Sequence, residues 1–314
     1  MIRGSRRYLR PEAIARIARL ELRAKAVVEG ALAGLHKSPF KGHSAEFLQH
    51  RDYVRGDDLR HVDWKVWARQ DRLYVKEYEE ETNLRLTLLV DGSASMDYRS
   101  AEPARGTIQT DGGPADRLGK YDCAATLAAS LAWLALSHGD AAGVGVFDDR
   151  VRAAVPARTS RAHLASIVEA LEAPRSPRPT AFQPVLTTAA ETLPRRGLVV
   201  IVSDLLGDHD GFFPGLRTLA RRGHDVMVVH VLDDDELDFP FAGPTRFEGL
   251  EQADQLACDP RSLRRGYLDA LHAFLADVRR RAAAAECDYA LVRTGEPLDA
   301  ALVRMLSRRA RVAV

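Results

Sequence analysis

The sequence predicts an α/β protein in which a doubly wound, mostly parallel sheet carries helices on both faces. From residue 84 onwards, short hydrophobic segments of strand length alternate with longer segments of helix length. This alternation is typical of a parallel sheet whose crossover connections are helices. The chain has 314 residues, of which 46% are hydrophobic, and is therefore long enough to bury the sheet in one large core.

Residues 1–83 are expected to form an N-terminal helix and an arm that pack on this core. Pro11 and the apolar residues that follow it at helical spacing predict an amphipathic helix. Aromatic residues within a densely charged segment indicate that 37–83 is an ordered arm rather than a disordered linker. These aromatic residues include Phe40, Phe47, Tyr53, Trp64, Trp67 and Tyr74.

The main domain, 84–314, is expected to supply the strands and helices of the sheet. Strands are predicted at 84–90, 142–147, 151–155, 198–202, 226–232 and 289–292. Helices are predicted at 118–138, 160–171, 181–192, 212–222, 260–285 and 298–309. We expect one strand of the sheet to run antiparallel, the last two helices to form a pair, and residues 245–259 to form an inserted hairpin.

Two polar loops are expected at the carboxyl edge of the sheet, where ligands bind in open α/β folds. Residues 97–117 follow the first strand and are rich in Gly and Pro, which predicts a mobile insertion. Residues 233–238, with the sequence DDDELD, follow the fifth strand. We expect this second segment to be a solvated acidic loop.

Charge and cysteine content limit the functional classes. The formal net charge of +1 argues against attraction of DNA or anionic lipid by the whole surface, so no nucleic-acid partner is expected. Cys123, Cys258 and Cys287 lie far apart and predict neither a disulfide framework nor a zinc site. There is no apolar signal region and no run of about 18 apolar residues. We therefore expect a soluble, cytoplasmic protein without a membrane span.

Five oxygen-bearing side chains are expected to meet at the carboxyl edge of the sheet. Asp91, Ser93 and Ser95 follow the first strand in the loop DGSAS. Thr180 precedes a predicted helix, and Asp204 ends the next buried strand. Carboxylate and hydroxyl oxygens suit a hard cation such as Mg²⁺. Because only two of the five residues are acidic, the cation would keep net positive charge and an open position for a carboxylate of a partner protein.

These motifs resemble two known families. The order Asp-x-Ser-x-Ser, Thr, Asp is similar to the metal-ion-dependent adhesion site of von Willebrand factor A domains. The stretch SPFKGHSAEFLQHRDYVRGDDLRHVDWKVWARQDRLYVKEYEEE and the following LTLLVDGSASMD resemble the bacterial family called domain of unknown function 58 (DUF58), over 37–310. The resemblance implies that Ser93, Ser95 and Thr180 are direct or near-direct metal ligands. It implies that Asp91 and Asp204 hold the ion partly through water.

The resemblance also implies a function without catalysis. Members of the family are expected to bind Mg²⁺, or else Mn²⁺ or Ca²⁺, and to use the ion to grip another protein. The implied partner is an AAA+ ATPase of the MoxR type, and the implied process is the assembly, remodelling or activation of other proteins. On this hypothesis the chain is not an enzyme and has no catalytic residues.

Two other functional classes stay open from the sequence. A Mg²⁺-dependent, phosphatase-like hydrolase would use Asp91 as its nucleophile, but the chain has Ser93 where such an enzyme carries a second acid. A nucleic-acid-binding protein would use the Arg clusters at 261–265, 279–281 and 304–311, provided that they form one continuous face. Turnover of a phosphoester or salt-dependent retention on DNA would favour these classes.

Overall fold

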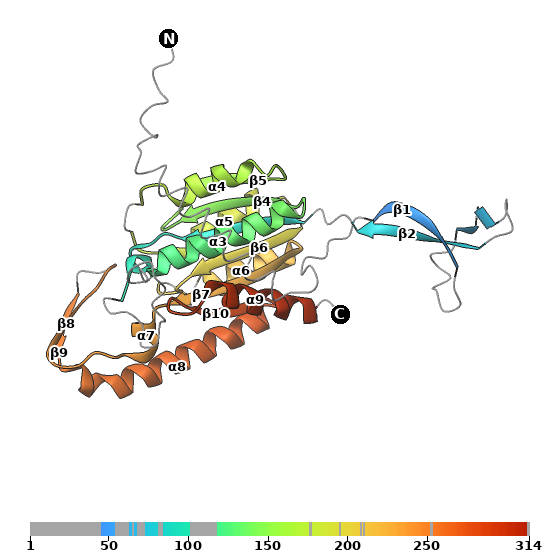
Figure 1. Ribbon diagram of the computed structural model, residues 1–314. Coiled ribbons are helices and arrows are strands. Elements are labelled where there is room, and N and C mark those ends of the chain that lie inside the picture. The colour runs from blue at the N-terminus through green and yellow to red at the C-terminus, as the bar shows by residue number, and fades with distance from the viewer. Residues whose placement is uncertain are drawn as a thin grey trace, which may run out of the picture.

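The computed structural model describes residues 45–53, 63–64, 66–67, 73–80, 84–100, 118–175, 178–194, 196–207, 209, 211–251 and 254–312. The helix predicted after Pro11 and most of the loop predicted at 97–117 lie outside these residues. These residues form a central sheet, the helices that cover it and two short hairpins (Figure 1).

A six-stranded sheet forms the centre of the main domain, as predicted. All neighbouring strands run parallel except the pair at one edge, which is antiparallel. In spatial order the strands are β10 (Asp288–Arg293), β7 (His224–Leu232), β6 (Gly197–Ser203), β3 (Arg85–Asp91), β4 (Ala141–Phe147) and β5 (Val151–Arg158). The prediction of a mostly parallel sheet with one antiparallel strand, β5, is therefore confirmed.

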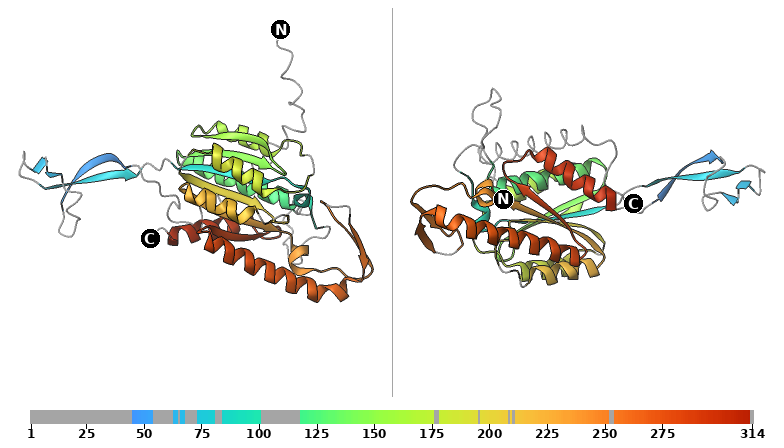
Figure 2. Two further views of the ribbon diagram at one scale, coloured as in Figure 1. Left: turned by 180° about the vertical axis from the view of Figure 1, so that it is seen from behind. Right: turned by 90° about the horizontal axis from the view of Figure 1, so that it is seen from below.

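Helices cover both faces of this sheet (Figure 2). One core includes residues of α3 (Lys120–Ser137), α4 (His163–Leu171) and α9 (Leu298–Val312), and the other includes residues of α5 (Phe182–Thr192), α6 (Phe212–Arg221) and α8 (Pro260–Ala284). In β3, Leu88 and Val90 belong to the first core and Leu89 to the second. Successive residues of the strand are hydrophobic because they point to opposite faces and both faces are buried. Among the described residues, no helix is both long enough and apolar enough to cross a membrane.

Two hairpins lie outside the six-stranded sheet. β8 (Thr245–Glu248) and β9 (Gln255–Cys258) pair antiparallel and form the insertion predicted at 245–259. β1 (Ala45–Asp52) and β2 (Tyr74–Glu80) form a separate two-stranded sheet from the arm, at one end of the main domain (Figure 1). The packing of residues 1–83 on the core stays a prediction.

The acidic segment after β7 is a short helix and not the loop that we expected. In front of α7 (Asp234–Asp238), the Asp233 carboxylate accepts a hydrogen bond from the backbone amide of Asp235. The Glu236 carboxylate accepts one from the amide of Asp233 at 2.7 Å. This capping box satisfies amides that the first turn leaves without partners, so four consecutive acidic residues can begin a helix.

Gly143 shows how closely β5 packs along β4. The ladder between the two strands shifts register near this residue, and a Cβ built on it would lie 2.6 Å from the backbone oxygen of Val155. Gly143→Ala is expected to lower the free energy of unfolding by about 1–3 kcal/mol, because the β5 backbone has to move. Gly266→Ala in α8, where a Cβ meets open space, is expected to raise it by roughly 0.5–1 kcal/mol. Urea denaturation of both variants measures the contrast, and equal effects would contradict the steric argument.

Candidate metal centre

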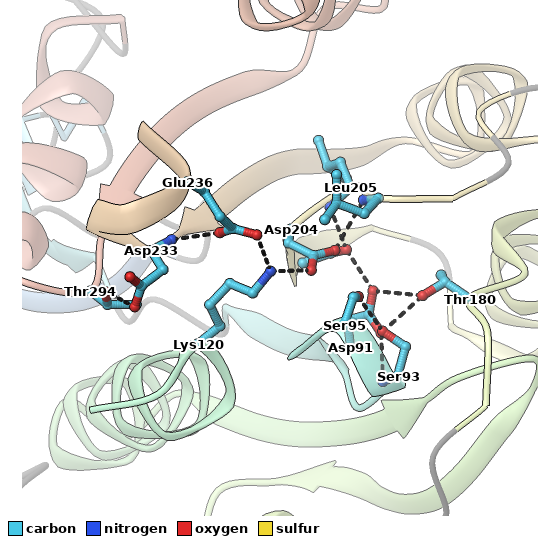
Figure 3. Close-up of polar contacts among 12 residues, drawn as sticks. Asp91, Ser93, Ser95, Lys120, Thr180, Asp204, Leu205, Asp233, Glu236 and Thr294 are labelled. Atoms are coloured by element: carbon cyan, nitrogen blue, oxygen red, sulfur yellow. Dashed lines mark hydrogen bonds and ion pairs between the residues drawn. The ribbon is translucent and has the colours of Figure 1, made fainter. Parts of the chain in front are cut away.

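The structure brings the five predicted side chains together at the carboxyl edge of the sheet (Figure 3). Asp91 is the last residue of β3, and Ser93 and Ser95 lie in the turn that leads into the 3-10 helix η2 (Ala94–Asp97). Thr180 stands just before α5, and Asp204 directly follows β6. Parallel strands bring their carboxyl ends to one edge, which is why residues far apart in sequence meet here.

Hydrogen bonds connect four of these side chains around Asp91. The backbone amide of Ser93 donates to Asp91 Oδ1 at 2.9 Å, and the Thr180 hydroxyl lies 3.2 Å from Oδ2. The hydroxyls of Ser93 and Ser95 are 3.1 Å apart. Asp91 is 0% exposed and Ser95 5% exposed, so the oxygens form a buried cluster rather than a solvated turn.

Burial and the neighbouring Asp204 raise the cost of ionising the Asp91 carboxylate. Burial, together with the nearby charge of Asp204, raises the pKa of Asp91 to about 7, while hydrogen bonds from Ser203 and Ser93 act in the opposite direction. A divalent cation between the carboxylates would offset this repulsion. The donor set of two carboxylates and three hydroxyls therefore fits a hard cation.

Ser203 is a site residue that the sequence reasoning missed. Its hydroxyl donates to Asp91 Oδ2 at 2.6 Å and accepts from the backbone amide of Leu205 at 2.9 Å. Ser203 thus connects the ends of β3 and β6. Its position beside Asp204 in the motif IVSDLL was the available signal, because the last residues of a strand reach the same sheet edge.

Lys120 is the second residue that was missed, and it supplies a buried positive charge. Its Nζ lies 2.7 Å from Asp204 Oδ2 and 2.7 Å from Glu236 Oε1, and its side chain is 1% exposed. Burial alone would lower the pKa of Lys120, but the carboxylates of Asp204 and Glu236 outweigh it and raise the pKa. The ammonium is therefore charged and neutralises part of the negative charge beside the proposed metal position.

Asp204 has both carboxylate oxygens engaged. Oδ2 accepts from Lys120, and Oδ1 accepts from the backbone amide of Leu206 at 3.0 Å. The turn that aims this amide needs a left-handed backbone at Leu205, with φ of 53°, and the fully buried Leu205 side chain holds it there. An Asp204 held in this way suits an outer position, in which it would reach a cation through water.

The two polar segments expected at this edge do lie beside each other. The Tyr98 hydroxyl donates to Asp235 Oδ2 at 3.1 Å, and the Ser100 hydroxyl donates to Asp233. Thr294, just after β10, donates to the second oxygen of Asp233 at 2.7 Å. The first two contacts connect the loop after β3 to α7. The contact between Thr294 and Asp233 lies next to the Lys120 ion pairs (Figure 3).

Hydroxyl oxygens would have to complete the coordination of a metal here. Within the part of the chain that the structure describes, no three His, Cys, Asp or Glu side chains gather closely enough to hold an ion by themselves. The candidate centre thus rests on the combination of Asp91 and Asp204 with Ser93, Ser95 and Thr180. Metal binding by these five residues stays a prediction.

Comparison with known proteins identifies the family. The family model described as "Protein of unknown function DUF58" matches residues 49–274, which is more than half of the chain. The chain belongs to the DUF58 family. This DUF58 protein is 30% identical over 310 residues to "Uncharacterized protein Rv1480" of Mycobacterium tuberculosis (strain ATCC 25618 / H37Rv), covering 97% of this chain and 92% of the relative. A shorter relative from Mycobacterium avium, "Uncharacterized protein MAV169", is 30% identical over 167 residues, covering 51% of this chain and 96% of the relative.

Two solved structures with a similar fold come from Bacteroides species. The DUF58 protein is similar to the conserved hypothetical protein BatB from Bacteroides thetaiotaomicron, with a TM-score of 0.44 and 16% identity over 73% of this chain and 99% of that one. An aerotolerance-related membrane protein from Bacteroides fragilis NCTC 9343 gives a TM-score of 0.44 and 14% identity, with the same coverage of both chains.

Proposed function

We propose that this DUF58 protein is a non-enzymatic, metal-dependent protein-binding module. Ser93, Ser95 and Thr180 would bind Mg²⁺, or Mn²⁺ or Ca²⁺, directly or nearly so, and Asp91 and Asp204 would balance its charge partly through water. The open position of the ion would accept an Asp or Glu carboxylate of a partner protein. The partner that we propose is an AAA+ ATPase of the MoxR type, in the cytoplasm, acting in the assembly or remodelling of other proteins.

The observation that carries this proposal is the buried convergence of hydroxyls around Asp91. A turn that only satisfied its own backbone would need the hydrogen bond from the Ser93 amide and little more. Here the hydroxyls of Thr180 and Ser203, from distant parts of the chain, also point at the Asp91 carboxylate. Paired hydroxyls of Ser93 and Ser95 next to two carboxylates form an oxygen-rich set of the type that hard cations prefer.

The hydrolase alternative is less well supported by the same geometry. A nucleophilic Asp91 would need an oxygen open to the substrate, but this residue is 0% exposed and both of its oxygens accept hydrogen bonds. Turnover of a generic phosphoester by the wild type, lost in Asp91→Asn, would nevertheless establish the enzyme and overturn our proposal.

Calorimetric titration with Mg²⁺ and Mn²⁺ tests the proposal directly. Wild type is expected to bind the ion, and Asp91→Ala is expected to lose at least about tenfold in affinity, because both charge balance and orientation of the hydroxyls are lost. Asp269→Ala, which removes an exposed carboxylate of α8, serves as the matched control and is expected to bind as wild type does. Absence of metal binding by the wild type would sink the proposal.

A capture experiment tests the partner. Immobilised wild-type protein is expected to retain a MoxR-type ATPase in Mg²⁺ and to release it in EDTA, whereas Asp91→Ala is expected to retain little in either buffer. Equal retention in Mg²⁺ and EDTA would show that the ATPase binds elsewhere, for example on the arm at 37–83.

A further inference from the structure

The β8–β9 hairpin brings the Glu251 carboxylate into contact with Ser95, one of the five side chains of the candidate metal centre. Glu251 lies in the connection between the two strands, which the amide of Gly249 closes by donating to the carbonyl of Asp254 at 2.8 Å. Figure 1 and the left view of Figure 2 show the far end of this hairpin reaching back towards η2. Ser95 is part of η2. The hairpin therefore returns to the loop after β3, from which it is separated by more than 150 residues in the sequence.

Glu251 is placed against Ser95 with one oxygen lacking a partner. The Glu251 carboxylate interacts with both the hydroxyl and the backbone amide of Ser95. Oε1 of Glu251 is buried and makes no hydrogen bond with the residues that the structure describes. A buried carboxylate oxygen without a donor is costly unless a cation or donor satisfies it, and the nearest candidate position for a cation is beside Ser95.

Aromatic contacts hold the β8–β9 hairpin in place and so position Glu251 in its turn. Phe247 of β8 stacks on Phe239, with ring centroids 5.7 Å apart, and Phe239 packs on Tyr267 of α8 at 4.6 Å. The Tyr267 hydroxyl donates to the carbonyl of Glu236 at 2.9 Å, and the Glu236 carboxylate binds Lys120. A continuous set of contacts therefore joins the base of the hairpin to the Lys120 ion pairs at the same sheet edge.

The rest of the hairpin has little to hold it down. Leu250 and Leu256 are 51% and 53% exposed, and β9 is exposed over most of its length. The hairpin is thus held through Phe247 on one side and touches Ser95 through Glu251 in its turn, while most of β9 is exposed. Such a segment opens at low cost in comparison with the core elements.

We propose that Glu251 is an internal ligand of the metal centre, which occupies the position that a partner's carboxylate would take. This inference rests on the proposed function, and it adds that the β8–β9 hairpin regulates the site. A tethered carboxylate acts at an effective concentration on the order of millimolar, so a single carboxylate of a partner has to displace it before binding. A partner protein that also binds or moves the hairpin displaces Glu251 and reaches the ion.

Mn²⁺ is the probe for the test, because its effect on water-proton relaxation reports how many water molecules exchange at the bound ion. Glu251→Gln is expected to lower Mn²⁺ affinity by about tenfold, as for loss of one charged ligand, and to raise the relaxation per bound ion because water takes the vacated position. Glu248→Gln on the same hairpin, where the side chain is exposed, is the matched control and is expected to equal wild type in both measurements.

The outcomes separate this inference from the proposed function. If the wild type binds Mn²⁺ in an Asp91-dependent manner and Glu251→Gln equals it in affinity and relaxation, the metal centre stands and the internal ligand is refuted. If the wild type binds no Mn²⁺, both are refuted together. If Glu251→Gln, but not the control Glu248→Gln, shows lower Mn²⁺ affinity and higher water-proton relaxation per bound ion, the internal ligand is supported.

Discussion

Replacing Lys120 with methionine is expected to lower the free energy of unfolding by about 3–5 kcal/mol, the usual cost of breaking a buried ion pair on one side. The variant leaves Asp204, which is 0% exposed, and Glu236, at 18%, without the ammonium that both contact at 2.7 Å. Methionine fills a similar volume, so the loss reports charge rather than a cavity. Urea denaturation in EDTA measures it.

The pH dependence of that loss checks its cause. Burial already raises the pKa of Glu236, and removing the opposing Lys120 charge raises it further. The loss should therefore be larger at pH 8, where the Glu236 carboxylate has to be ionised, than at pH 5, where its protonation in the folded state relieves the cost. Arg265→Met, at a side chain that is 96% exposed, is the control and is expected to change stability by less than about 0.5 kcal/mol. A loss for Lys120→Met as small as that of the control would show that the ion pairs carry no net stability.

Asp91→Asn is expected to stabilise the metal-free protein while abolishing its response to metal. Since the pKa of Asp91 is raised from its ordinary value to about 7, the folded state releases this proton less readily than the unfolded chain. The ionised side chain therefore costs stability, and the cost grows as pH rises from about 4 to about 7. Removing the charge is expected to raise the free energy of unfolding at pH 8 by on the order of 1–3 kcal/mol, after allowance for weakened hydrogen bonds.

Denaturation with and without Mg²⁺ completes this test. In EDTA the gain for Asp91→Asn should be full at pH 8 and nearly absent at pH 4. In Mg²⁺ the wild type should gain stability in proportion to the logarithm of ion concentration above its Kd, whereas the variant should not. Asp269→Asn is the exposed control. Destabilisation of Asp91→Asn in EDTA at pH 8 would mean that the carboxylate is satisfied without metal, which contradicts the candidate centre.

The fold was predictable because its signals are local. Strands such as β3 and β6 are buried on both faces and appear as uninterrupted hydrophobic runs, and helices such as α3 have the length that separates them from strands. One error concerns the last two helices, which we expected to form a pair but which belong to the two different cores on opposite faces of the sheet. Another, local error concerns α7. Asp233 and Glu236 have the spacing of a capping box, a helix signal that the high density of negative charge obscured.

The candidate site was predictable only in part. Asp91 and Asp204 follow strands, so a shared sheet edge brings them together whatever the details of packing. Lys120 meets partners 84 and 116 residues away, and Glu251 meets Ser95 only through the course of the hairpin. Contacts of this kind depend on tertiary geometry, and neither spacing nor composition reports them.

The two ion pairs of Lys120 connect the candidate metal centre to α7 and, through further contacts, to the β8–β9 hairpin. One ammonium joins the start of α3 to the end of β6 and to α7. Tyr267 of α8 donates to the carbonyl of Glu236 in α7 and packs on Phe239, which in turn stacks on Phe247 of the hairpin. Thermodynamic linkage requires that any ligand whose affinity depends on bound metal changes the affinity for metal by the same factor. A protein that bound only the hairpin, without contacting the ion, would thereby raise or lower the affinity of the centre for metal.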